Sequence, residues 1–169
     1  MAERIANFCP ICGESTIQAE RFGRLRPVCP ACGHVVFFDP KVAVVAFVLR
    51  EGCVLLIQRS SDVSGAGKWA LPGGYVEADE DPREAIQREM LEETGLHVEI
   101  GPVLDVFYGS TEGGTITIAY TAHVRDGVLT PGDDAAAVGW FAPDALPELV
   151  FLSTETLVAR WITGNPLYE

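Results

Sequence analysis

The chain has 169 residues, 48% of them hydrophobic, and a formal net charge of -12. This length fits one domain of ordinary size with a small appendage. The acidic charge makes nucleic acid a poor candidate partner, because such binding requires Lys and Arg to neutralise phosphates. The longest apolar run, Val42–Leu49, is too short to cross a bilayer, and the first residues lack the apolar stretch of a signal peptide. We therefore expect a cytoplasmic protein with no membrane partner.

Two Cys-x-x-Cys pairs stand near the start of the chain, at Cys9 and Cys12 and at Cys29 and Cys32. This spacing is typical of a tetrahedral zinc site with four thiolate ligands. Two disulfides are the alternative, but they are rare in cytosolic proteins, and a redox-active pair would not need a second copy. So small a segment also needs a cross-link in place of a core. The sequence therefore predicts a zinc ribbon over residues 1–38.

The ribbon interleaves Phe22 with Arg24 and Arg26, a pattern that can stack bases and bind phosphates. The alternative is a solvated hairpin with one packed aromatic ring. Residues 1–33 hold four arginines and three glutamates, so they lack the strong positive charge of a nucleic-acid-binding patch. We favour the solvated hairpin, with a role in packing on the main domain or in the association of two chains.

The main domain is expected over residues 39–169, because Asp39-Pro40 interrupts the chain. The apolar run of residues 41–50 predicts a strand buried on both faces, followed by a turn and a partner strand over residues 53–59. Arg59 ends that partner strand just before a loop. Strand ends that face a loop often carry ligand contacts, so Arg59 is a candidate substrate-binding residue, with a surface salt bridge as the alternative.

A helix is predicted from Pro82 to the residue before Gly95. Asp81 can cap its start, with Glu84 completing a capping box, and Gly95 suits a left-handed C-terminal turn. Three carboxylates, those of Glu89, Glu92 and Glu93, fall at i, i+3 and i+4 and share one face of this helix. Such crowded like charges repel unless a cation lies among them, and hard oxygen ligands select Mg²⁺ or Mn²⁺.

The remaining chain predicts strands over residues 97–100, 103–108 and 115–124, and a terminal amphipathic helix over residues 153–162. Ser153 is expected to cap this helix. Glu112 lies in the loop of residues 109–114, where a late-arriving base and a merely solvated side chain are both open readings. No Ser or Cys nucleophile pairs with a His in a known elbow, so nucleophilic catalysis is not indicated.

The stretch from Gly73 to Leu96 resembles the signature of the Nudix hydrolases, G-x5-E-x7-R-E-U-x-E-E-x-G-U, where U is a bulky apolar residue. Every fixed position of that pattern is met: Gly74, Glu80, Arg88, Glu89, Met90, Glu92, Glu93, Gly95 and Leu96. The resemblance implies an α/β/α sandwich built round a mixed sheet, with the zinc ribbon in front. It also implies hydrolysis of a nucleoside diphosphate linked to another moiety.

The resemblance further implies a divalent cofactor, Mg²⁺ or Mn²⁺, beside the structural Zn²⁺. Its ligands would be the three glutamates and one backbone carbonyl, that is Glu89, Glu92, Glu93 and Gly73. Glu80 and Arg88 would hold this metal-binding face in place. Gly74 would border the substrate, and Asp134, six positions before Trp140, matches an acidic position that assists metal or water activation in relatives. Glu77 also matches a common family glutamate, without an assigned role.

A zinc ribbon before such a domain resembles NADH pyrophosphatases and a group that acts on ADP-ribose or FAD. The Ser-Gln-Pro-Trp-Pro-Phe-Pro signature of the NADH enzymes is absent after the helix, which favours ADP-ribose or FAD with release of AMP. NADH or NAD pyrophosphatase and nucleoside triphosphate pyrophosphohydrolase remain alternatives. So do a nucleotide sensor without catalysis, against which the intact glutamates argue, and a nucleic-acid adaptor. Related domains often pair as homodimers, and the sequence leaves this open.

Overall fold

The computed structural model describes residues 5–61, 65–110 and 114–165. These residues form two compact units, one made by the chain up to Pro40 together with Ser110, and the other by the rest. No helix within the described residues is long and apolar enough to span a membrane. Glu112, considered above as a base, lies outside the described residues.

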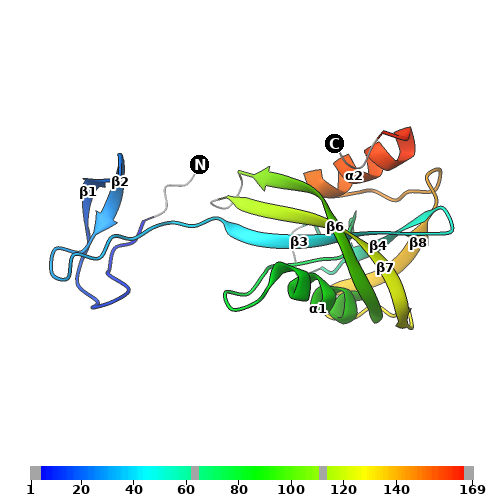
Figure 1. Ribbon diagram of the computed structural model, residues 1–169, viewed down its shortest axis with the longest axis horizontal. Coiled ribbons are helices and arrows are strands. Elements are labelled where there is room, and N and C mark those ends of the chain that lie inside the picture. The colour runs from blue at the N-terminus through cyan, green and yellow to red at the C-terminus, as the bar shows by residue number, and fades with distance from the viewer. Residues whose placement is uncertain (1–4, 62–64, 111–113, 166–169) are drawn as a thin grey trace. The chain divides into compact units, whose positions relative to one another are not determined.

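The first unit is a hairpin beside a cluster of cysteines. Strands β1 (Ile17–Arg21) and β2 (Arg24–Val28) pair in antiparallel register (Figure 1). The two Cys-x-x-Cys turns repeat the same bonding pattern, since Gly13 N–H donates to Cys9 O and Gly33 N–H donates to Cys29 O, both at 2.9 Å. Both glycines have φ of 76°, a left-handed conformation that favours glycine.

The four Sγ atoms of Cys9, Cys12, Cys29 and Cys32 lie within 4.8 Å of one another. Neighbouring sulfurs are 3.5 to 3.6 Å apart, close to the edge of about 3.8 Å of a tetrahedron with Zn–S bonds of about 2.3 Å. All five cysteines of the chain are free thiols. The donor set and its size therefore fit Zn²⁺, as the spacing predicts.

The second unit is built on a mixed sheet. Its strands are β3 (Lys41–Arg50), β4 (Cys53–Arg59), β5 (Trp69–Ala70), β6 (Leu96–Gly109), β7 (Thr115–Gly127) and β8 (Ala135–Phe141). In the described part of the chain their order is β5-β4-β3-β7-β6, and β8 pairs with β4. Among the strand pairs of the described residues, β3 and β7 run parallel and the other pairs are antiparallel.

One helix covers each face of this sheet (Figure 1). Helix α1 (Pro82–Thr94) packs Ala85, Ile86 and Met90 against one face of β3, while helix α2 (Leu152–Thr163) packs Leu157 and Val158 against the other. Alternate residues of β3 point to opposite faces, so a strand this apolar fits a position buried on both sides. The predicted α/β/α sandwich is confirmed.

The helix ends differ in part from the prediction. Asp81 caps α1, but its side chain accepts from Arg83 N–H at 2.8 Å rather than from Glu84, so the predicted capping box does not form in the described structure. Gly95 ends α1 in the left-handed conformation, as predicted. Helix α2 begins one residue earlier than predicted, after Phe151, and Ser153 is a buried helix residue instead of a cap.

The zinc content of the purified protein and of two cysteine variants tests the cysteine cluster. We expect the purified protein to contain about one Zn²⁺ per chain by inductively coupled plasma mass spectrometry. Cys29→Ser should lose this metal because three thiolates bind it more weakly, whereas Cys53→Ser, a change to the cysteine outside the cluster, should keep it. Equal zinc contents in the two variants would contradict the assignment.

Candidate active site

The segment before α1 lies along β3 and brings two glycines against the helix. Val44 N–H donates to Gly74 O and Ala46 N–H donates to Pro72 O, both at 2.9 Å. A Cβ on Gly73 would lie 2.0 Å from Val44 O, and one on Gly74 would lie 2.5 Å from a carboxylate oxygen of Glu89. The motif therefore needs glycine at Gly73, where a side chain would meet main chain, whereas a side chain at Gly74 would displace the Glu89 carboxylate.

Arg88 connects the segment to the acidic face of α1. Its guanidinium donates to both carboxylate oxygens of Glu80 at 2.9 and 3.0 Å, to Glu89 at 2.8 Å, to Glu92 at 3.0 Å and to Tyr75 O at 3.2 Å. These bonds raise the pKa of Arg88, and the two bonds to Glu80 lower the pKa of that carboxyl group. Arg88 is therefore a structural cation whose donors are already used.

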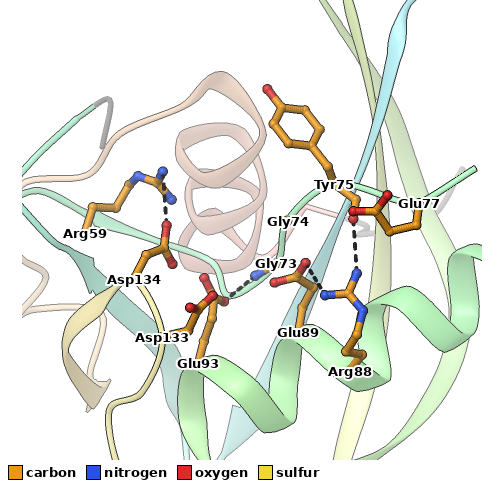
Figure 2. A pocket seen from close by; sticks show the side chains of 10 residues that line it. All are labelled: Arg59, Gly73, Gly74, Tyr75, Glu77, Arg88, Glu89, Glu93, Asp133 and Asp134. Atoms are coloured by element: carbon orange, nitrogen blue, oxygen red, sulfur yellow. Dashed lines mark hydrogen bonds and ion pairs between the residues drawn. The ribbon is translucent and has the colours of Figure 1, made fainter. Parts of the chain in front are cut away.

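Glu93 is the most buried of the three predicted ligands, with 1% of its surface exposed. One carboxylate oxygen accepts from Gly73 N–H at 2.7 Å (Figure 2). Burial raises the pKa of Glu93 to about 9, and the neighbouring carboxylates of Glu89 and Asp134 also raise it. Burial likewise raises the pKa of Glu89. A bound cation would stabilise the ionised form of two carboxylates that are largely shielded from water.

The loop after β7 places two further carboxylates opposite α1. Thr130 N–H donates to Thr94 O at 3.0 Å and Gly132 N–H donates to Glu93 O at 3.2 Å, which ties the loop to the end of the helix. Asp133 follows with φ of 49°, and Asp134 forms an ion pair with Arg59 at 3.8 Å. The Gly-Asp-Asp sequence thus turns both aspartates toward the carboxylates of α1.

These elements enclose a cavity of about 380 Å³ (Figure 2). Most of the residues predicted for the site line it, whereas Glu80 and Glu92 do not. Three lining residues, Tyr75, Glu77 and Asp133, are absent from the predicted set. Glu77 was matched to a common family glutamate without a role, and the only sequence signal of the other two was adjacency, Tyr75 after the glycine pair and Asp133 before Asp134. The lining residues are Arg59, Gly73, Gly74, Tyr75, Glu77, Arg88, Glu89, Glu93, Asp133 and Asp134.

The carboxylate set fits a hard divalent cation, although it is not gathered round one point. Arg88 binds the carboxylates of Glu89 and Glu92, and Gly73 N–H binds that of Glu93. Among the described residues only the four cysteines form a group of three or more ligand atoms within 4.8 Å. Glu92 stands apart with 45% of its side chain exposed. Glu89 and Glu93, which face the cavity, are therefore the strongest candidates for metal ligands.

A helix presents carboxylates to a cavity, a main-chain segment is held against that helix, and an arginine lies at the far wall. These features are expected of a metal-dependent enzyme that acts on phosphate compounds. The comparison with known proteins agrees: the NUDIX domain model matches residues 39–161, most of the chain. The chain therefore belongs to the Nudix family and is a Nudix pyrophosphohydrolase, a class that uses a divalent metal and a nucleotide substrate.

Individual relatives differ in their substrates. An ADP-ribose pyrophosphatase from Methanocaldococcus jannaschii is 36% identical over 134 residues, covering 76% of this chain and 79% of the relative. A CTP pyrophosphohydrolase from Escherichia coli is 35% identical over 103 residues, 60% of this chain and 75% of the relative. An NAD-capped RNA hydrolase from Chromobacterium violaceum is 30% identical over 149 residues, 84% of this chain but only 52% of the relative.

Among solved structures, a Nudix hydrolase from Nitrosomonas europaea superposes with a TM-score of 0.84 at 27% identity and covers 97% of both chains. This similarity extends over nearly the whole chain, beyond the residues that the family model matches.

Glu93 should make the stability of the folded protein depend on pH, and this dependence can be measured without metal. Because its folded pKa is raised from 4.5 to about 9, the folded protein holds a proton that the unfolded chain releases, so stability falls as pH rises between these values. With EDTA present, the melting temperature of the wild type should fall by several degrees more than that of Glu93→Gln between pH 5.5 and 8.5. Glu84→Gln, at an exposed position of the same helix, should behave as the wild type.

Arg88→Lys tests the role of the guanidinium. A lysine has one ammonium in place of five forked donors, so it cannot hold Glu80, Glu89 and Glu92 together. We expect Mn²⁺ affinity, measured by isothermal titration calorimetry, to fall by about 10- to 100-fold. Arg83→Lys, on the same helix but outside this network, should change it by less than about twofold. Equal losses in both variants would argue against the role.

Proposed function

We propose that the protein hydrolyses the pyrophosphate bond of a nucleoside diphosphate derivative, ADP-ribose or FAD, and releases AMP. The observation that carries this choice is the charge of the cavity. Five of its lining residues are acidic, and of its two arginines Arg88 is fully occupied by its own carboxylates. A diphosphate diester carries fewer negative charges than a nucleoside triphosphate, so it meets less repulsion there.

Two further facts support this substrate class. The Methanocaldococcus jannaschii relative named for ADP-ribose matches this chain over a larger share than the relative named for CTP. The Ser-Gln-Pro-Trp-Pro-Phe-Pro signature typical of NADH pyrophosphatases is absent from the sequence. Because another relative is named for NAD-capped RNA, hydrolysis of NAD-capped RNA is the main alternative activity.

The residues of the cavity and of α1 would have different roles in this reaction. Glu89 and Glu93 would hold Mg²⁺ or Mn²⁺, with Glu92 and the Gly73 carbonyl as further ligands, and the bound ion would offset phosphate charge and lower the pKa of a water molecule. Arg88 and Glu80 keep the carboxylates of α1 in place. The Gly73 N–H orients the Glu93 carboxylate. Asp134 is a candidate to accept a proton beside Glu93.

The direct test is a phosphatase-coupled phosphate assay with Mg²⁺ over ADP-ribose, FAD, NADH, NAD, CTP and a diadenosine polyphosphate. ADP-ribose or FAD should be cleaved with the highest kcat/KM, and chromatography should show AMP as a product. Glu93→Gln should lose at least about 100-fold because a ligand of the catalytic metal is removed. Glu84→Gln, which changes charge at an exposed position of α1, should stay within about twofold.

Other outcomes are equally informative. A clear preference for CTP or NADH would leave the enzyme class intact and overturn the substrate. Binding of ADP-ribose without cleavage of any compound would favour a nucleotide sensor. Tight, salt-sensitive retardation of RNA in a gel-shift titration would point to a nucleic-acid role for the ribbon.

A further inference from the structure

The main-chain segment from Leu71 to Gly74 is hydrogen-bonded along both of its edges. On one edge, the carbonyls of Pro72 and Gly74 accept from N–H groups of β3, both at 2.9 Å. Peptide groups of an extended chain point alternately to either side, so the N–H groups of Leu71 and Gly73 face away from β3. Because a buried N–H group without an acceptor is costly, each of these two groups requires a partner from elsewhere in the fold.

Side chains of the two helices provide these partners. Gly73 N–H donates to Glu93 of α1 at 2.7 Å (Figure 2), and Leu71 N–H donates to Thr154 Oγ1 of α2 at 3.1 Å. The second bond is fully buried, since Leu71 is 2% exposed and Thr154 is 1% exposed. Helices that lie on opposite faces of the sheet therefore bind the same segment at two N–H groups only two residues apart.

The chain before α2 brings Thr154 to this position. Trp69 N–H donates to Glu148 O and Val150 N–H donates to Trp69 O, both at 2.9 Å, so the residues before α2 run beside the start of the segment. Thr154 then accepts from Leu71, two residues after Trp69 on the same edge. A threonine inside a helix commonly bonds a carbonyl of its own helix, whereas the hydroxyl oxygen of Thr154 accepts from a distant segment.

We propose that Thr154 is a positioning residue of the active site, which holds the segment where Gly73 can contact Glu93 and a metal ion. This inference rests on the proposed function, in which Glu93 and the Gly73 carbonyl are ligands of that ion. Gly73 contributes both its N–H group and its carbonyl, so a shift of the main chain would displace both at once. Thr154 itself does not line the cavity, and it therefore acts through the segment alone.

Two substitutions at Thr154 separate the hydrogen bond from packing. Thr154→Val keeps the shape of the side chain and removes the acceptor, which leaves Leu71 N–H buried and unpaired. The segment then gains free energy by moving toward water or another acceptor, and Gly73 moves with it. Thr154→Ser keeps the acceptor and loses only a methyl group, so it should retain the position of the segment.

Val158 offers a matched control on the same helix. It lies four residues after Thr154, is 1% exposed and packs in the core between α2 and the sheet. Val158→Ala leaves a small cavity there and should lower the melting temperature by several degrees, as Thr154→Val should. A valine side chain cannot accept a hydrogen bond from the segment, so this variant reports the effect of lost stability alone.

The first experiment is isothermal titration calorimetry of the full chain with Mn²⁺. Thr154→Val, and Thr154→Ala as a second variant without the acceptor, should weaken Mn²⁺ binding about 10-fold because groups around the ion are displaced. Thr154→Ser should stay within about threefold of the wild type, and Val158→Ala within about twofold. Thermal melts would show that each variant is folded at the temperature of the titration.

Amide hydrogen exchange followed by NMR in EDTA provides a second measurement, which needs neither metal nor turnover. In Thr154→Val, exchange at Leu71 and Gly73 should accelerate at least about 10-fold more than exchange at the amides of β4, because the loss of restraint is local. In Val158→Ala, the lower stability should accelerate exchange in the segment and in β4 to a similar extent.

Unchanged Mn²⁺ affinity in Thr154→Val, an equal loss in Val158→Ala, or an equal loss in Thr154→Ser would overturn the positioning role. A wild type that does not bind Mn²⁺ would also overturn it, because the segment would then have no ion to serve. The substrate can fail separately: the expected affinities and exchange rates without cleavage of ADP-ribose or FAD would retain the positioning role and reject the substrate. Cleavage of ADP-ribose with unchanged Mn²⁺ affinity in Thr154→Val would do the reverse.

Discussion

The position of the Glu93 carboxylate is the constraint on which the rest of the site depends. A carboxyl group with 1% exposure must be neutral, hydrogen-bonded or close to a cation. Here it accepts one hydrogen bond from Gly73 N–H, and two other carboxylates lie near it. That bond requires the main chain before α1 to pass close to the helix, and on its other side the same segment lies so near Val44 O of β3 that Gly73 has no room for a side chain.

Arg88 reduces the repulsion between glutamates on the same helix. A row of glutamates at i, i+3 and i+4 would destabilise α1 through repulsion between like charges. By binding Glu80, Glu89 and Glu92 at once, the guanidinium offsets part of that repulsion and links α1 to the preceding segment through Tyr75 O. It leaves Glu93 outside its reach, which is why burial dominates the pKa of that residue.

The sequence predicted the helix, its acidic face and the cysteine cluster because local spacing determines them. Glu89 and Glu93 share a face by helical geometry alone, and Gly95 ends the helix by its own conformation. Glu92 was placed with them by the same geometry, but 45% of its side chain is exposed and it does not line the cavity. Asp133 enters the site through hydrogen bonds between a distant loop and the end of α1, a tertiary contact with no periodic signal.

The acidic composition of the cavity couples the affinity for a metal ion to the affinity for a phosphorylated ligand. Without a cation, the ionised carboxylates of the cavity, such as those of Asp133 and Asp134, repel a phosphate. A bound divalent ion lowers that repulsion, so it raises the affinity for the phosphorylated ligand, and by thermodynamic reciprocity the ligand raises the affinity for the ion. The acidic cavity therefore disfavours phosphate binding in the metal-free protein. Selectivity for phosphorylated ligands follows from the same carboxylates that make the metal necessary.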